Sequence, residues 1–318
     1  MSYAPIVLFI YNRPRHTQLT LIALASNELA KRSDLYIYAD GPKPKAGAAD
    51  QEKISAVRLL AANAKGFKSV TVFERETNLG LANSIFSGVT EIISIKGKAI
   101  ILEDDLITSP YFLEYMNEGL ALFEADKQVG SINAHAELFL KSHKFPEYFL
   151  LDGADCWGWA TWKDRWEGFT LDPKLIKDEL FKTNKLKEFE YGPHLNLLNL
   201  QIAKKIDTWD VQWHGFNVLK HRKGIFPKYS FIENIGLDGS GTHGDMTNKV
   251  FEVDSDALNQ YKFKLTDWNK HKAEKELIWA QKKYKKIYKK KHVSSLSKKL
   301  MNLATNKLRK LIKMIRKL

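Results

Sequence analysis

The chain has 318 residues, of which 44% are hydrophobic and 27% are charged, a composition typical of a folded protein with one large core or two modest ones. Its single cysteine, Cys156, excludes an internal disulfide framework and a cysteine-rich zinc site. The formal net charge of +13 is unevenly distributed along the chain. Residues 262–318 carry 20 basic and 3 acidic side chains, which leaves the rest of the chain mildly acidic.

The first half of the sequence alternates between predicted strands and predicted helices. Short apolar runs predict strands at residues 6–10, 35–39, 70–73, 99–102 and 129–132, and helical spacing predicts helices at residues 17–30, 50–63, 81–94 and 111–125. The pair Ser109-Pro110 predicts the cap and start of the last helix. This alternation indicates an α/β fold with a mainly parallel sheet, in which ligands bind beyond the carboxyl ends of the strands.

Polar residues follow four of these strands. In chain order they are Arg13, Asp40, Asn78 and the adjacent acids Glu103, Asp104 and Asp105. Three adjacent carboxylates repel one another and are partly desolvated at a strand end, so a positive charge should lie beside them. The acids could form a solvated loop that favours the next helix, or they could bind Mg²⁺ or Mn²⁺, which prefer oxygen ligands. The metal site is favoured, because no polar spacer separates the acids from the strand.

After about residue 133 the alternation stops, and aromatic and glycine-rich segments follow. The segment "DCWGWATWKDRW", residues 155–166, contains four tryptophans, and "TWDVQWHGF", residues 208–216, adds two more. The segment "LDGSGTHGD", residues 237–245, is a glycine-rich loop with one histidine. Tryptophan usually builds core, but indole rings also stack on the apolar faces of sugars.

The segment "AIILEDDLITSPYFLEYM", residues 99–116, resembles the aspartate-rich DXD motif of GT-A glycosyltransferases. The likeness points to the family of the Golgi enzyme that adds the first branch N-acetylglucosamine to N-glycans, and to its bacterial relatives. It extends in order through "PIVLFIYNRP", "YIYADGPK", "DCWGWATW", "WDVQW" and "GTHG", and covers residues 4–245. The resemblance implies a nucleotide-sugar-binding half at residues 1–132 and an acceptor-binding, catalytic half at residues 133–260. Residues 261–318 remain as a basic helical tail.

The same resemblance implies roles for the residues at the strand ends. Asp105 would bind the metal, Mn²⁺ or Mg²⁺, whereas Glu103 and Asp104 would hold the ribose or the sugar of the donor. Arg13 would reach the nucleotide or its phosphates, and Asp40 would accept a hydrogen bond from the base. Two of these assignments have structural alternatives, because Arg13 precedes a proline and could end a strand, and Asp40 begins an ordinary turn sequence.

Asn78 and His243 complete the predicted donor site. Relatives use the loop that matches His243 as a lid, so this histidine would contact a phosphate or supply a second metal ligand, and the alternative is a flexible surface turn. Trp157, Gly158 and Trp159 match a substrate-pocket segment of the relatives. The two tryptophans alternate along the chain, so only one of them need face the pocket.

Asp210 is the predicted catalytic base. Inverting transfer needs a group that takes the proton of the acceptor hydroxyl, and an aspartate between Trp209 and Trp213 would be shielded from water, as suits such a base. The base of the relatives falls in a similar Trp-Asp segment. The alternatives are a cap for a helix that begins near Val211, and the neighbouring Asp207 as the base.

The tail is expected to bind an anionic surface. Residues 262–291 are basic with interspersed aromatic residues, and residues 296–318 place leucine and isoleucine at three-to-five-residue steps opposite lysine and arginine. This pattern is typical of a helix that lies in an anionic membrane surface, whereas nucleic-acid phosphates do not require the apolar stripe. No stretch approaches the roughly 20 apolar residues of a membrane span. We expect a cytoplasmic protein, peripheral on the inner face of the cytoplasmic membrane.

Together these features predict an inverting, metal-dependent glycosyltransferase. The expected partners are a UDP-sugar donor and a glycan or lipid-linked glycan acceptor, used for lipopolysaccharide or capsule synthesis. A sugar nucleotidyltransferase would share the sheet and the acids, but it usually shows a glycine-rich basic loop after the first strand, and "YNRPRHTQ" lacks the glycines. A basic nucleic-acid-binding protein is the non-enzyme alternative, which the near-neutral body disfavours.

Overall fold

The computed structural model describes residues 3–136, 146–190, 192–238, 258–259, 279 and 282–287. His243, the rest of its glycine-rich loop after residue 238, and the predicted amphipathic stripe at residues 296–318 lie outside the described residues. Within these described ranges, no helix is long and apolar enough to cross a membrane.

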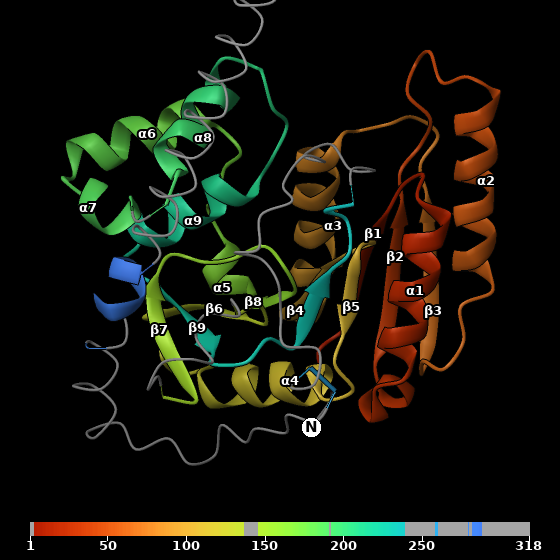
Figure 1. Ribbon diagram of the computed structural model, residues 1–318, viewed down its shortest axis with the longest axis horizontal. Coiled ribbons are helices and arrows are strands. Elements are labelled where there is room, and N and C mark those ends of the chain that lie inside the picture. The colour runs from red at the N-terminus through yellow and green to blue at the C-terminus, as the bar shows by residue number, and fades with distance from the viewer. Residues whose placement is uncertain are drawn as a thin grey trace, which may run out of the picture.

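An eight-stranded sheet forms the centre of the protein (Figure 1). Its strands, in chain order, are β1 (Ile6–Ile10), β2 (Asp34–Ala39), β3 (Ser69–Glu74), β4 (Lys98–Glu103), β6 (Val129–Asn133), β7 (Tyr148–Asp152), β8 (Trp159–Trp162) and β9 (Lys223–Pro227). They lie in the order β3-β2-β1-β4-β8-β6-β9-β7. The first four are mutually parallel, and β8 runs antiparallel to both β4 and β6. The predicted α/β fold with a mainly parallel sheet is confirmed.

The helices of the first half follow the predicted order and cross over between parallel strands. They are α1 (Pro14–Ala25), the short 3₁₀ helix η1 (Glu28–Arg32), α2 (Ala48–Ala62), α3 (Leu81–Lys96) and α4 (Phe112–Leu122). The prediction that Ser109 caps α4 was wrong, because Tyr111 directly precedes this helix. The Ser109 N–H donates instead to the Phe231 carbonyl at 2.8 Å, which fixes the turn before α4 against a distant part of the chain.

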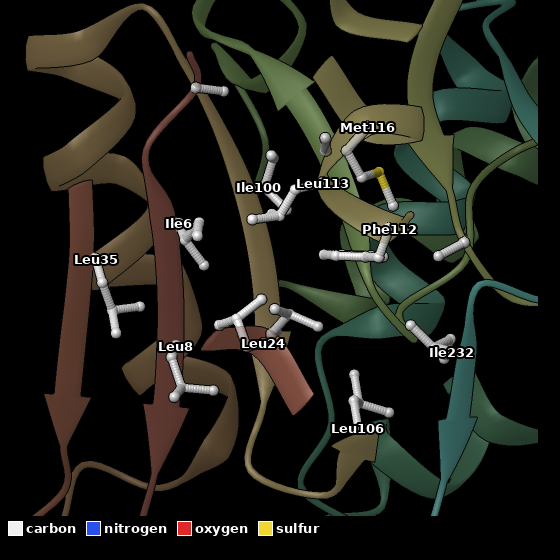
Figure 2. Packing of buried hydrophobic residues seen from close by; sticks show 14 of the residues in the cluster. Ile6, Leu8, Leu24, Leu35, Ile100, Leu106, Phe112, Leu113, Met116 and Ile232 are labelled. Atoms are coloured by element: carbon white, nitrogen blue, oxygen red, sulfur yellow. The ribbon is translucent and has the colours of Figure 1, made fainter. Parts of the chain in front are cut away.

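One face of the sheet is covered by α1, α2 and α4. Figure 2 shows how side chains from the strands and from these helices meet there. Ile6 and Leu8 of β1 and Ile100 of β4 are fully buried, and Leu24 of α1 and Phe112 of α4 pack against this layer. Full burial of an apolar side chain of this size contributes about 1.5–3 kcal/mol relative to exposure, so this layer holds the parallel strands in register.

The other face is covered by α3 and by the helices of the second half. These are α5 (Lys163–Trp166), α6 (Pro173–Lys182), α7 (Leu186–Phe189), α8 (His194–Ile202) and α9 (Asp210–Leu219), of which α6 to α9 gather at the upper left of Figure 1. Four of the tryptophans noted in the sequence, Trp159, Trp166, Trp209 and Trp213, pack in the core of this face. The ring of Trp159 lies 5.1 Å from that of Trp209 and 5.4 Å from that of Trp213, and all three are buried.

Two further segments lie against the main sheet. The strands β5 (Leu106–Thr108) and β10 (Ile232–Asn234) form a small antiparallel sheet that brings the chain after β9 back to the acids. Residues 282–287 form a helical segment, blue in Figure 1, beside β7. Lys285 pairs with Asp152 at 2.6 Å, so part of the basic tail is anchored to the body.

Candidate active site

The three acids lie where β4 leaves the sheet. Residues 99–102 are buried and hold β4 between β1 and β8, so the chain turns away only at its carboxyl end. Glu103 is the last residue of the strand, and Asp104 and Asp105 form the turn toward β5. The Thr20 hydroxyl of α1 donates to the Asp104 backbone carbonyl at 2.9 Å, which fixes this turn.

Arg13 supplies the positive charge that the acids require. It lies between β1 and α1, donates through Nη2 to the Asp104 carboxylate, and places Nη1 2.9 Å from Asp105 Oδ2. The Tyr11 N–H also approaches Asp104 Oδ2, at 3.4 Å. Burial by itself lowers the pKa of Arg13, but the charges of Asp104 and Asp105 outweigh it and raise the pKa. Arg13 is therefore a permanent cation held between two carboxylates.

Glu103 is protonated more readily than an ordinary glutamate. Burial raises the pKa of Glu103 to about 8, and the charges of Asp105 and Asp104 add to the rise, which Arg13 only partly offsets. Burial also raises the pKa of Asp104, against the opposing effect of Arg13. Near neutral pH the Glu103 carboxyl can therefore donate a hydrogen bond to a ligand oxygen.

The segment after β10 covers the acids from a distant part of the chain. The Ile235 N–H donates to the Asp105 carbonyl at 2.9 Å, and His16 Nε2 lies 3.3 Å from the Ile235 carbonyl. A Cβ atom at Gly236 would lie 2.1 Å from Asp105 Oδ2 and 2.9 Å from Arg13 Nη1. A side chain at position 236 would therefore require this ion pair to shift.

Asp40 and Asn78 join the ends of β2 and β3. Asp40 Oδ1 accepts hydrogen bonds from the N–H groups of Gly41 and Leu79, both at 3.0 Å. Asn78 donates to the Gly41 carbonyl at 3.0 Å and accepts from the Gly80 N–H at 3.2 Å. The two predicted donor-site residues therefore lie together, and both already hold backbone groups of their own loops.

Asp210 is the first residue of α9. Its carboxylate accepts a hydrogen bond from the Thr208 hydroxyl. In the structure as described, the position before the helix belongs to Trp209, with no capping side-chain bond, so the alternative in which Asp210 caps a helix starting near residue 211 was wrong. Burial dominates the raised pKa values of both Glu103 and Cys156, and the charge of Asp210 adds to each, so Asp210 lies within electrostatic range of the acid motif.

Asp207 lies three residues earlier and faces a different helix. Its Oδ2 accepts a hydrogen bond from the Leu81 N–H, the first residue of α3, at 3.1 Å. The first N–H groups of a helix have no partners within the helix, so Asp207 satisfies one of them. Of the two acids, Asp210 is the one that lies within electrostatic range of Glu103.

The three predicted substrate-pocket residues differ in their surroundings. Trp159 is 0% exposed among other tryptophans, so the prediction that it contacts a substrate was wrong and it is a core residue. Gly158 is buried with φ +64°, and a Cβ there would lie 3.2 Å from the Phe112 ring, so it shapes the turn. Trp157 is half-buried, and its ring lies 4.7 Å from that of His135. Trp157 is therefore the indole of this segment that can meet a ligand.

The acids offer the oxygen ligands that Mg²⁺ and Mn²⁺ prefer. Across the described residues, no group of three or more His, Cys, Asp or Glu side chains is arranged to hold a metal ion. Asp104 and Asp105 are instead both paired with Arg13. A divalent ion at Asp105 would therefore need most of its ligands from a phosphate-bearing substrate.

Two residues near the site escaped the sequence analysis. Gly236 packs against Arg13 and Asp105, which lie far from it in the sequence. His135 follows the end of β6, and the rule that selected polar residues after strands could have found it. Its role is taken up below.

No protein-family model and no curated protein matches the chain. Among solved structures, a mannosyltransferase from Pyrobaculum calidifontis in complex with GDP-Man and Mn²⁺ aligns at 9% identity and a TM-score of 0.38, over 69% of this chain and 70% of that chain. The glycosyltransferase GlyE of Streptococcus pneumoniae aligns at 13% identity and a TM-score of 0.32, over 66% and 42%. A UDP-glucose pyrophosphorylase complexed with UDP-glucose aligns at 11% identity and a TM-score of 0.35, over 70% and 90%. Likenesses of this size carry no argument about activity, which therefore rests on the residues of the site.

Proposed function

We propose that this protein is an inverting glycosyltransferase that moves a sugar from a nucleotide donor to a glycan or lipid-linked glycan. The observation that carries the proposal is the strand edge at which Arg13 pairs with Asp104 and Asp105, within electrostatic range of Asp210. Ligands of such sheets bind at this edge. A cation and a nearby carboxylate base suit a reaction with an anionic leaving group and a nucleophile that must lose a proton.

The donor is assigned to the side of β1, β2 and β3. Arg13 would donate from its planar guanidinium to the diphosphate, and Asp105 would hold Mn²⁺ or Mg²⁺ together with it. When bound, the ion would neutralise the negative charge that develops on the leaving diphosphate. Asp40 would accept a hydrogen bond from the imide N–H of a uracil base, with Asn78 holding its loop in place. A UDP-sugar is the expected donor.

The remaining assignments on the donor side concern the sugar and the phosphates. Glu103 and Asp104 would hold the ribose or the donor sugar, and the raised pKa of Glu103, due mainly to burial, allows it to donate to a hydroxyl oxygen. His243 would contact a phosphate or the metal from the glycine-rich loop.

The reaction is assigned to Asp210. It would take the proton of the acceptor hydroxyl while that oxygen attacks the anomeric carbon from the face opposite the diphosphate. The new carbon–oxygen bond forms as the bond to the diphosphate oxygen breaks, so the configuration at the anomeric carbon inverts. Trp157, the partly exposed indole, would pack on the apolar face of a sugar.

The test is a panel of nucleotide sugars offered to the full chain with Mn²⁺ or with EDTA. We expect one donor to raise the melting temperature and to be slowly hydrolysed to a nucleoside diphosphate, in a Mn²⁺-dependent manner. Ligand binding at a hundredfold excess over Kd adds about 2.7 kcal/mol of apparent stability. Production of inorganic diphosphate from a nucleoside triphosphate and a sugar phosphate would instead identify a sugar nucleotidyltransferase. Full activity in EDTA would contradict the metal assignment.

A peripheral position on the inner face of the cytoplasmic membrane is proposed from the sequence of the tail, with an acceptor used for lipopolysaccharide or capsule and no nucleic-acid partner. Residues 282–287 anchor part of this tail on the body through Lys285. Deletion of residues 294–318 should release the protein from anionic vesicles while turnover on a soluble acceptor continues. Vesicle binding that survives the deletion would contradict the proposal.

A further inference from the structure

His135 lies at the same edge of the sheet as the acids, directly after β6. The backbone before it is held on both sides, because the Ala134 N–H donates to the Gly158 carbonyl at 2.8 Å and the Phe231 N–H donates to the Ala134 carbonyl at 2.9 Å. His135 itself is 6% exposed. The imidazole ring is therefore positioned by a rigid part of the fold.

Both ring nitrogens of His135 lack a hydrogen-bond partner in the structure as described. A buried polar atom without a partner keeps its full desolvation penalty, and such atoms are rare in folded proteins. By contrast, the half-buried His194 places its Nδ1 2.8 Å from the Phe189 carbonyl. The unpaired state of His135 points to a group that is absent from the free protein.

The surroundings of His135 fit a neutral sugar better than an ion. Burial lowers the pKa of His135, with Asp155 as an opposing influence, so the imidazole is neutral and carries one donor and one acceptor. A hydroxyl group also donates and accepts. The Trp157 ring meets the imidazole edge-on, at 4.7 Å between ring centres, and supplies an apolar face next to the polar one. An anion would be disfavoured by the nearby Asp155 carboxylate.

The strand order places this pair on the acceptor side. β6 is separated from β4 only by β8, so His135 lies two strands from the acids, about 10 Å away. Arg13, Asp40 and Asn78 follow β1, β2 and β3, on the opposite side of β4. Burial raises the pKa of Cys156, the residue next to Trp157 in the chain, and the charge of Asp210 adds to the rise, so Asp210 lies within electrostatic range of this side as well.

We propose that His135 is a specificity-determining residue that hydrogen-bonds a hydroxyl of the acceptor sugar, while the apolar face of that sugar packs on Trp157. The proposal rests on the proposed transferase function and names the recognition of its acceptor. Both nitrogens are shielded in the free protein, so the sugar must displace part of their cover. Trp157 is a partly exposed neighbour in contact with the ring, so it forms part of this cover.

The test compares His135→Phe with His135→Gln. Phenylalanine keeps an aromatic ring but removes both unpaired nitrogens, so we expect a melting temperature equal to or above that of the wild type. The acceptor KM should rise about tenfold to a hundredfold, which corresponds to one unpaired hydrogen-bonding group, with donor Kd unchanged. Glutamine should restore part of the acceptor affinity. In His194→Phe, a paired histidine is lost, so the melting temperature should fall and the acceptor KM should stay the same.

A lower melting temperature for His135→Phe would overturn the proposal, because it would show that the nitrogens have a structural partner such as a buried water. An unchanged acceptor KM would overturn it as well. A series of acceptors that each lack one hydroxyl sharpens the result. Removal of the hydroxyl that binds His135 should raise the acceptor KM of the wild type and leave the acceptor KM of His135→Phe unchanged.

If the wild type transfers no sugar at all, the proposed function fails. Glycan binding measured by saturation-transfer NMR then tests the role of His135 separately. Binding that is lost in His135→Phe supports the proposal, and binding that is equal in both proteins overturns it.

Discussion

Strands β1, β2 and β3 lie on one side of β4, and strands β8, β6, β9 and β7 lie on the other. On the first side the polar residues at the strand ends are paired with one another, as in Arg13 with Asp104 and Asp105. On the second side, the described structure leaves both ring nitrogens of His135 without partners. Charges that are paired before any ligand arrives stabilise the fold and prepare the site at once. The His135 imidazole is instead available to a ligand.

This comparison predicts different consequences for substitutions on the two sides. On the donor side, changes at Arg13 should affect the free energy of unfolding together with donor binding. On the acceptor side, changes at Asp210 or His135 should alter turnover or acceptor affinity and leave donor binding intact.

The largest expected effect is that of Asp105→Ala. We expect turnover to fall below detection and Mn²⁺-dependent donor binding to disappear, because this carboxylate is the proposed metal ligand. The fold should persist, since Arg13 keeps its bond to Asp104. Steady-state kinetics and calorimetric titration of the donor measure both effects. Asp34→Ala, which removes an acid paired with Lys68 at the start of β2, is the control and should not change turnover. Donor binding that stays dependent on Mn²⁺ in Asp105→Ala would move the metal elsewhere.

Asp210→Asn should lower kcat about a hundredfold to ten-thousandfold, the usual contribution of a general base. Asparagine keeps the size of the side chain and can still accept the Thr208 hydroxyl bond, so the fold should be unchanged. Donor Kd should also stay the same, because the lost interaction acts mainly in the transition state. Asp207→Asn is the matched control. Wild-type transfer by Asp210→Asn would show that another acid is the base.

Arg13→Met should lower the free energy of unfolding by about 3 kcal/mol, because it leaves a buried carboxylate unpaired. The side chain of Asp104 is 5% exposed, so water cannot replace the lost partner. Urea denaturation measures the change. Arg13→Lys keeps the charge but not the two-pronged geometry, and should fall between the wild type and Arg13→Met. Stability equal to that of the wild type in Arg13→Met would mean that the acids are neutralised by another group.

The pKa of Glu103 predicts a pH dependence of stability. In the folded protein burial raises this pKa from 4.5 to about 8, so between these values the folded state holds a proton that the unfolded state has released. The stabilisation is complete below the unfolded pKa and is lost as pH rises through the folded pKa. The free energy of unfolding should fall by about 4 kcal/mol across this range, and Glu103→Gln should remove this part of the slope. Identical slopes in the two proteins would show that Glu103 titrates normally.

The smallest effect is expected at Asp207. Asp207→Ala should cost about 1 kcal/mol of stability by leaving the Leu81 N–H at the start of α3 unpaired, with kcat unchanged. Asp207→Asn should be nearly silent, because asparagine accepts the same bond. Thermal unfolding and kinetics of the two variants distinguish this structural role from catalysis, which would instead appear as a loss of kcat.

Asp207 and Asp210 lie three residues apart in one segment and show why part of the site could not be predicted from the sequence. Asp207 and Asp210 have similar neighbours in the sequence, and either could have been the base. Only the folded chain decides, because α9 begins at Asp210 and places it within electrostatic range of Glu103, while Asp207 reaches α3. Trp157 and Trp159 give the same lesson. Their alternation predicted that one would face inward, and the register of β8 against β4 determined which one.

The order of strands and helices in the first half, and the position of the acids at the end of β4, follow from local patterns in the sequence. Apolar periodicity and turn residues act within short windows, so these features can be read locally. The pairing of Arg13 with Asp104, 91 residues later, and the packing of Gly236 against the same ion pair become visible only in the folded chain. Such contacts depend on the order and register in which distant strands pair. The sequence pattern predicts that the three acids need a positive charge beside them, and the folding of the sheet determines which residue supplies it.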